Sequence, residues 1–157
     1  MLVTVKRKDF EAMNDPSLIW TCIEPTIQKI RGKNFTIKSE AYLQLNEGQK
    51  ALLMIQILYG HTLHGVEEFY SHLSYLLSNK GMWSQLKNGM LYFGAYDMIR
   101  LLDEMNTVYD DLKTGKLPSY STLSRLDVLL NEILPSVISM VGSYIRSNPE
   151  QFVQFVD

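Results

Sequence analysis

The chain is poor in cysteine and histidine and has no long hydrophobic run. These scarcities argue against several classes of protein. Its one cysteine, Cys22, cannot form an internal disulfide, so we expect a protein of a reducing compartment, the cytoplasm. No stretch approaches the roughly 20 apolar residues of a membrane span. The apolar start MLVTV is also too short for the core of a signal sequence. We therefore expect no membrane as a partner.

The chain also lacks a strong charge of either sign. Its 15 basic and 17 acidic residues give a formal net charge of −2, so there is no global electrostatic reason to bind nucleic acid directly. Hydrophobic residues make up 46% and charged residues 20%, which is ordinary for a soluble globular protein. A length of 157 residues suits a single domain, so we expect one helical domain over residues 1–157.

Capping residues mark several helix starts in the first half of the chain. Asp15 followed by Pro16 predicts a helix that begins there, is kinked or divided by Pro25, and ends near Gly32. Asn46 and Gln49 have the spacing of a capping box, and the residues behind them, KALLMIQILY, are apolar on nearly all sides. This segment is expected to be the central, most buried helix.

Apolar spacing predicts further helices in the second half. A last long helix is expected to begin at Ser119 or Ser121 and to kink near Leu134, because Pro135 removes an internal hydrogen bond. Strand-like alternation is confined to VTVK and FTIKSEAY, so the expected fold class is all-α, with about six to eight helices. The other predicted helices cover the segments 61–79, 83–93 and 95–112.

The segment GHTLHGVEEFYSH, residues 60–72, contains every histidine of the chain. On one continuous helix, His61, His64, Glu68 and His72 would share a face. Imidazole and carboxylate groups are ligands for zinc or iron, so these four residues are the candidate metal ligands. Three interpretations stay open, namely a metal site, a polar helix face or a surface that contacts a partner. A complete metal site would need an acid from another helix, and the candidates are Asp97, Asp103 and Glu104.

A second polar strip follows the helix predicted over residues 95–112. Asp97, Glu104 and Asp111 recur every seven residues, which places three carboxylates along one side. Such a strip is either a solvated face or a docking site for a basic protein partner. With the two acidic residues of the histidine segment added, the candidate binding residues are Glu67, Glu68, Asp97, Glu104 and Asp111.

Catalytic residues cannot be assigned from the sequence. Cys22 lies in the apolar stretch IWTCI, and a free cysteine in such surroundings is usually a packed core residue. Lys113-Thr114-Gly115-Lys116 lacks the first glycine, the following Ser or Thr and the preceding strand of a phosphate-binding loop. We therefore expect no catalytic residues outside the metal interpretation.

Two segments resemble a bacterial all-helical family of largely unknown function that includes a protein described as a DNA mimic. Its members carry a Gly-Gly-Phe-x-Gln-Phe-Phe segment on one helix and a Gly-Ala pair at the start of a later one. Residues 64–70 are similar to the first segment, with Gly65 at the second glycine and Phe69-Tyr70 at the aromatic pair, and Gly94-Ala95 is similar to the second. The resemblance implies an all-helical fold and a binding role, without catalytic residues to carry over.

These observations favour a non-catalytic module that binds or regulates another macromolecule, without a cofactor. The expected partner is another protein, with a second copy of the chain in a homodimer as one candidate. The alternative is an enzyme that depends on a divalent metal such as zinc or iron, held by the histidine segment. Gly65 and Gly94 are further expected to let two helices approach closely, since glycine has no side chain.

Overall fold

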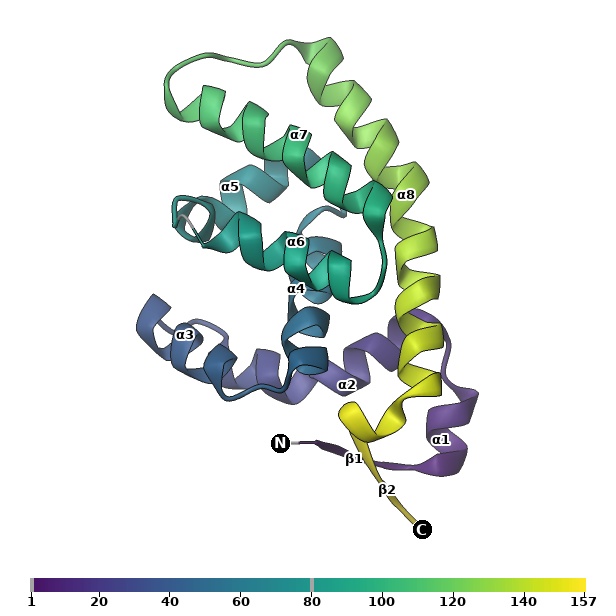
Figure 1. Cartoon of the computed structure of the whole chain (residues 1–157). Helices are drawn as coiled ribbons and strands as arrows, with labels where there is room; N and C mark the ends of the chain where they lie inside the picture. The colour runs from purple at the N-terminus through teal and green to yellow at the C-terminus, as the bar shows by residue number, and fades with distance from the viewer. Residues whose placement is uncertain (1, 80) are drawn as a thin grey trace.

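The computed structural model describes residues 2–79 and 81–157, which form eight α-helices, one 3₁₀ turn and a two-stranded sheet (Figure 1). The predicted all-α class is confirmed, at the upper end of the expected number of helices. In chain order the elements are β1 (Val3–Lys6), α1 (Arg7–Ala12), α2 (Asp15–Ile30), α3 (Phe35–Leu43), α4 (Glu47–His61), α5 (Val66–Leu77), α6 (Met82–Tyr92), α7 (Tyr96–Lys113), α8 (Tyr120–Ser147), η1 (Pro149–Gln151) and β2 (Val153–Val156).

Helix α4 is the centre of the fold, as predicted, and it packs against α2, α5 and α6. The predicted capping box starts it: the Asn46 side chain accepts from the Gln49 backbone N–H at 2.8 Å, and the Gln49 side chain accepts from the Asn46 N–H at 3.2 Å. Helix α6 packs very close to α4 because the residue of α6 at their contact is Gly89, which has no side chain. A Cβ at Gly89 would lie 2.7 Å from the Cβ of Met54, a distance that real side chains do not tolerate.

Three expected boundaries in the first half differ from the structure. The N-cap of α2 is Asn14, whose side chain accepts from the Ser17 backbone N–H, so Asp15 and Pro16 lie inside the first turn. Helix α2 also continues through Pro25 as one element. The strand-like segment FTIKSEAY is the helix α3, capped by Asn34, because the local cap determines its conformation and no partner strand lies beside it among the described residues.

Helices α7 and α8 agree more closely with the prediction. The cap of α8 is Ser119, whose side chain accepts from the Thr122 backbone N–H at 3.1 Å. Helix α8 continues through Pro135. Contrary to the expectation from sequence, α8 is long and apolar enough to cross a membrane by length and composition alone. Part of it belongs to the core, since Leu126, Val141 and Ile145 are buried, and the core helix of a soluble protein meets the same criteria.

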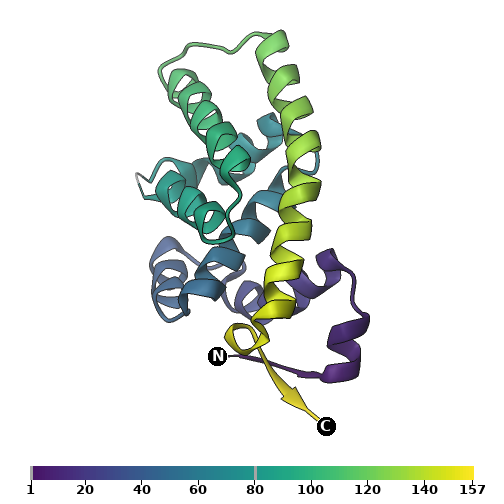
Figure 2. The same ribbon diagram turned by 45° about the vertical axis from the view of Figure 1, so that its right-hand side comes forward.

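The two ends of the described chain meet in a small parallel sheet (Figure 2). The register pairs Val3 with Val153 and Lys6 with Val156. The prediction of VTVK as strand-like is confirmed. The second strand, VQFV, lies in a terminal segment to which the sequence assigned no structure, because a strand needs a partner that the local sequence does not reveal.

Candidate functional site

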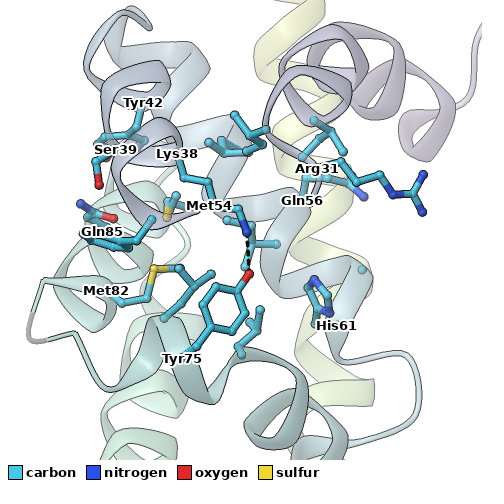
Figure 3. A pocket seen from close by; sticks show the side chains of 18 of the residues that line it. Arg31, Lys38, Ser39, Tyr42, Met54, Gln56, His61, Tyr75, Met82 and Gln85 are labelled. Carbon is cyan, nitrogen blue, oxygen red and sulfur yellow. Dashed lines mark hydrogen bonds between the residues drawn. The ribbon is translucent and has the colours of Figure 1, made fainter. Parts of the chain in front are cut away.

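A cavity of about 600 Å³ lies among α2, α3, α4, α5 and α6 (Figure 3). Its volume falls within the range of roughly 300–1,000 Å³ that is typical of small-molecule sites. The walls are mainly apolar, and five helices contribute to them. The apolar wall includes Ile27 and Ile30 of α2, Leu53, Met54 and Ile57 of α4, Leu73 and Leu76 of α5, and Met82 of α6.

The mouth of this cavity is lined by large apolar side chains that water contacts. The exposed fraction is 48% for Phe35, 74% for Leu43 and 56% for Tyr75, and Trp20 is also exposed. Scattered apolar side chains are normal on protein surfaces, whereas a group of them around a concave apolar site is typical of a ligand-binding region. The arrangement therefore indicates a binding site.

Helix α3 covers one side of the cavity and contributes little to the core. Ala41 is its one buried residue, while Phe35, Lys38 and Tyr42 line the cavity. The Lys38 ammonium donates to the Tyr75 hydroxyl of α5 at 2.7 Å, and Figure 3 shows these side chains pointing toward one another from α3 and α5. The Lys38 Nζ also lies 4.8 Å from the centre of the Tyr75 ring, a cation–π distance. This pair connects α3 to the rest of the fold.

The charged side chains that line the cavity are basic, namely an arginine, a lysine and a histidine that becomes positive when it is protonated. Arg31, Lys38 and His61 line it, and none of its described lining residues is an aspartate or glutamate. Burial lowers the pKa of His61, and the neighbouring His72 and Lys38 act in the same direction while Glu68 opposes them. The site therefore combines apolar walls with positive charge.

The histidine segment does not form the single helix that its sequence suggested. Helix α4 ends at His61 and α5 begins at Val66, so His61 and His64 are not on the same helix as Glu68 and His72. The turn nevertheless brings two imidazoles together, since the ring centroids of His61 and His72 are 6.1 Å apart. A continuous helix would separate residues 61 and 72 by roughly 16 Å along its axis, so the turn is what allows this contact.

The candidate metal ligands converge in part. The His72 Nε2 lies 3.6 Å from the Glu68 carboxylate, and His64 is exposed on the turn. Within residues 2–79 and 81–157, no group of three or more His, Cys, Asp or Glu side chains has an arrangement that could hold a metal ion. The metal interpretation of His61, His64, Glu68 and His72 stays a prediction.

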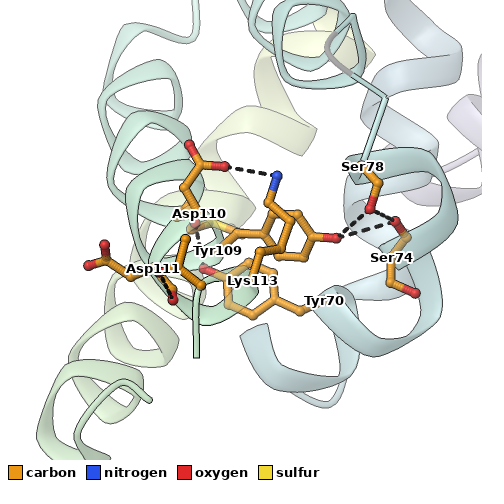
Figure 4. Close-up of polar contacts among 9 residues, drawn as sticks. Tyr70, Ser74, Ser78, Tyr109, Asp110, Asp111 and Lys113 are labelled. Carbon is orange, nitrogen blue, oxygen red and sulfur yellow. Dashed lines mark hydrogen bonds and ion pairs between the residues drawn. The ribbon is translucent and has the colours of Figure 1, made fainter. Parts of the chain in front are cut away.

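The carboxylates predicted as a docking strip on α7 lie on the surface, and most have a basic neighbour. Glu104 pairs with Arg125 of α8 at 2.7 Å, and Asp97 pairs with Arg100 on its own helix. Two neighbouring carboxylates are also paired: Asp103 with Lys87, and Asp110 with Lys113. Figure 4 shows the pair of Asp110 and Lys113. Asp111 and Glu67 are exposed. The pairs disperse the negative charge along α7, so the strip is less acidic than its sequence suggests.

A polar contact between α5 and α7 was not foreseen from the sequence (Figure 4). The Tyr70 hydroxyl donates to the Met105 carbonyl at 2.7 Å, and the Tyr109 hydroxyl donates to the Ser74 carbonyl at 3.2 Å. The Tyr109 hydroxyl also lies 3.1 Å from the Ser78 hydroxyl. Burial raises the pKa of Tyr70, with a smaller contribution from the negative charge of Asp127. These hydroxyls therefore connect α5 to α7.

The prediction that Cys22 is a core residue is confirmed. Its side chain is 1% exposed, and burial raises the pKa of the thiol to about 12. A thiol with this pKa is protonated at neutral pH, and it is the thiolate that acts as a nucleophile.

Comparisons with protein-family models, with curated proteins and with solved structures yield no match for this chain. The similarity of residues 64–70 and 94–95 to the helical family with a DNA-mimic member stays a prediction. The geometry of the cavity is therefore the feature of this chain that bears on its function.

Proposed function

We propose that this chain is a non-catalytic binding module of the cytoplasm and that its binding site is the cavity among α2–α6. The observation that carries the proposal is an apolar, solvent-accessible cavity of about 600 Å³ beside the one cluster that the buried apolar side chains form. The sequence suggested a protein partner, and the geometry favours an apolar ligand or apolar group inserted into the cavity. Regulation would follow if such a ligand changed what the module binds.

The way in which α3 is held supports this proposal. A helix with one buried residue gains little from its own packing, so its position depends on its caps and on contacts such as the bond from Lys38 to Tyr75. A ligand in the cavity would contact Phe35 and Tyr42 of α3 and bury apolar surface of these side chains. Binding is therefore expected to stabilise the fold.

The experiment is a titration with Nile red, a neutral apolar dye whose fluorescence rises in apolar surroundings. We expect saturable binding of one dye per chain, and we expect Gly60→Leu to abolish it. Gly60 lines the cavity, and a Cβ there would meet the Gln56 amide at an ordinary 3.6 Å, so a larger side chain can be accommodated at this point of the cavity wall. The variant is expected to fold, since replacing a helical glycine is favourable by roughly 0.5–1 kcal/mol.

The matched control is Asn131→Leu, which adds the same side chain to an exposed position of α8 outside the cavity. This variant should bind the dye as the parent protein does. Binding that is not saturable, or that Gly60→Leu leaves intact, would remove the cavity as the functional site.

A further inference from the structure

We propose that the ligand of the cavity is an amphipathic organic anion, namely a small molecule with an apolar body and one carboxylate. The carboxylate would bind at Lys38 and Tyr75, and the apolar body would lie against the walls formed by α4 and α5. This inference rests on the proposed function, because it names the chemical class that the same site would take.

The walls determine the apolar part of the ligand. Leu53 and Ile57 of α4 face the site together with Leu73 and Leu76 of α5, and none of these side chains offers a hydrogen bond. A polar ligand group placed among them would lose its hydrogen bonds to water without replacement. The body of the ligand is therefore apolar.

Lys38 determines the charge that we expect on the polar group of the ligand. Its ammonium has three N–H donors, and the bond that the structure gives it goes to the neutral hydroxyl of Tyr75. Neither Lys38 nor Arg31 forms an ion pair with a carboxylate in the part of the chain that the structure describes. Lys87 and Arg125 on the outer surface, by contrast, each have one. A carboxylate in the cavity would supply the missing negative charge.

The Tyr75 hydroxyl is a second hydrogen-bond donor, beside the Lys38 ammonium. Its hydroxyl oxygen accepts from Lys38 at 2.7 Å, which leaves its own O–H free to donate. The ammonium and the hydroxyl thus present two adjacent donors, which suits the two oxygens of one carboxylate. Hydrogen bonds from a cation to a carboxylate are about twice as strong as neutral ones. The pair therefore selects a carboxylate over a neutral group.

The experiment compares three amphiphiles that share one apolar chain, namely decanoate, decanol and decyltrimethylammonium. Each is titrated by calorimetry below its aggregation concentration at neutral pH. We expect decanoate to bind once per chain and at least tenfold more tightly than decanol, about the difference that one charge-assisted hydrogen bond makes. The cationic amphiphile should bind most weakly.

Two substitutions test whether Lys38 and Tyr75 produce the preference for decanoate over decanol. Lys38→Met keeps an apolar stem of similar length and removes the charge, so decanoate affinity should fall about tenfold or more, and decanol affinity, which does not depend on the charge, should fall clearly less. Tyr75→Phe keeps the ring and should produce a smaller loss for decanoate. Lys116→Met, which removes one positive charge at an exposed position outside the cavity, is the matched control and should bind decanoate unchanged.

The outcomes separate this inference from the proposed function. Equal affinity for decanoate and decanol, or a preference for the cation, would overturn the inference and keep the cavity as an apolar site. Binding of Nile red without binding of any amphiphile would also overturn it and would favour a macromolecular occupant, such as an acidic segment of a protein.

A dimer in light scattering that Gly60→Leu dissociates would assign the cavity to a second copy of the chain. Failure of Nile red and of all three amphiphiles would remove both proposals.

Discussion

His61 ends α4, lies half-buried beside the cavity, and has an ionisation coupled to the stability of the fold. Burial lowers its pKa in the folded state, and the nearby His72 and Lys38 add to this effect. Its neutral form is therefore favoured by folding. The unfolded chain, which carries a histidine of ordinary pKa, binds a proton more readily.

This difference predicts how stability depends on pH. Because the unfolded state takes up the proton first, His61 should contribute a loss of stability as pH falls through about 6.5, the ordinary histidine pKa, toward its lower folded value. Above that range it should have no effect. We expect His61→Gln to lose less stability than the parent protein between neutral and mildly acidic pH, as measured by urea denaturation. The same pH dependence in both proteins would contradict the prediction.

The metal interpretation is tested on the same residues. The turn between α4 and α5 places His61 near His72, with Glu68 beside the latter, and leaves His64 exposed. We expect protein purified without a tag or chelator to contain far less than one zinc, iron or manganese per chain by elemental analysis. One equivalent of metal that His72→Ala removes and His64→Ala retains would instead establish a site at this turn and support a metal-dependent enzyme.

At the level of the elements, glycines determine how the helices join and how closely they pack. The expectation that Gly65 and Gly94 allow close packing of helices is wrong for Gly94, where a Cβ would meet only the Met140 Cε, at an ordinary 3.8 Å. What Gly94 supplies is a positive φ of 75° in the turn from α6 to α7. The close approach of α6 to α4 depends on Gly89 instead.

Gly94→Val should therefore destabilise the protein through backbone strain. A β-branched residue at positive φ is a severe outlier, and we expect a loss greater than about 1 kcal/mol in the free energy of unfolding. Gly60→Ala is the matched control, because Gly60 is helical and its substitution should be neutral or stabilising. Chemical denaturation measures both variants. A denaturation midpoint and slope unchanged by Gly94→Val would refute this explanation.

Helix α5 obtains its N-terminal cap from another helix. Its first residue, Val66, donates its backbone N–H to the Asp127 carboxylate of α8 at 2.8 Å, since Gly65 has no side chain to serve as a cap. A Cβ at Gly65 would lie 3.1 Å from that carboxylate. Gly65 therefore serves both the turn and the contact with α8, a role that local sequence could not reveal because Asp127 lies 61 residues beyond Val66.

For the whole molecule, the pairing of β1 with β2 joins the two ends of the described chain beneath the helices (Figure 2). The Val3 N–H donates to the Phe152 carbonyl at 3.1 Å, and the Phe10 and Phe155 rings meet edge to face at 5.2 Å. Phe152 itself is 0% exposed and packs near Gly48 of α4. The C-terminal segment is therefore part of the core.

Phe152→Ala should destabilise the protein strongly although only five residues follow it in the sequence. Removing a buried phenylalanine side chain typically costs about 3–5 kcal/mol, because apolar burial is lost and a cavity is left. Tyr120→Ala is the control, since that aromatic side chain is 86% exposed and its loss should have little effect. Thermal unfolding monitored by circular dichroism compares the two. Equal melting temperatures would show that the C-terminal segment is not coupled to the core.

Local signals made much of the fold predictable. Caps such as Asn46 and Ser119, and the apolar spacing of α7, depend on neighbours in the chain and were interpreted correctly. The pairing of β2 with β1 was missed because the partner strand is distant in the sequence, whereas the Asn14 cap and the end of α4 at His61 are local features that were assigned wrongly. The acidic strip of α7 was also identified correctly by position, but its basic partners Lys87 and Arg125 lie on other helices.

The sequence by itself determined an all-α fold, a central buried α4, a core position for Cys22 and the places of the surface carboxylates, because each follows from residue spacing or composition. Only the tertiary structure decided where the cavity lies and which residues line it. Lys38 and Tyr75 are 37 residues apart and belong to no common motif. They become neighbours because α2, α5 and α6 pack on α4 while α3 packs on α2, and a cavity exists only once such separate helices enclose it.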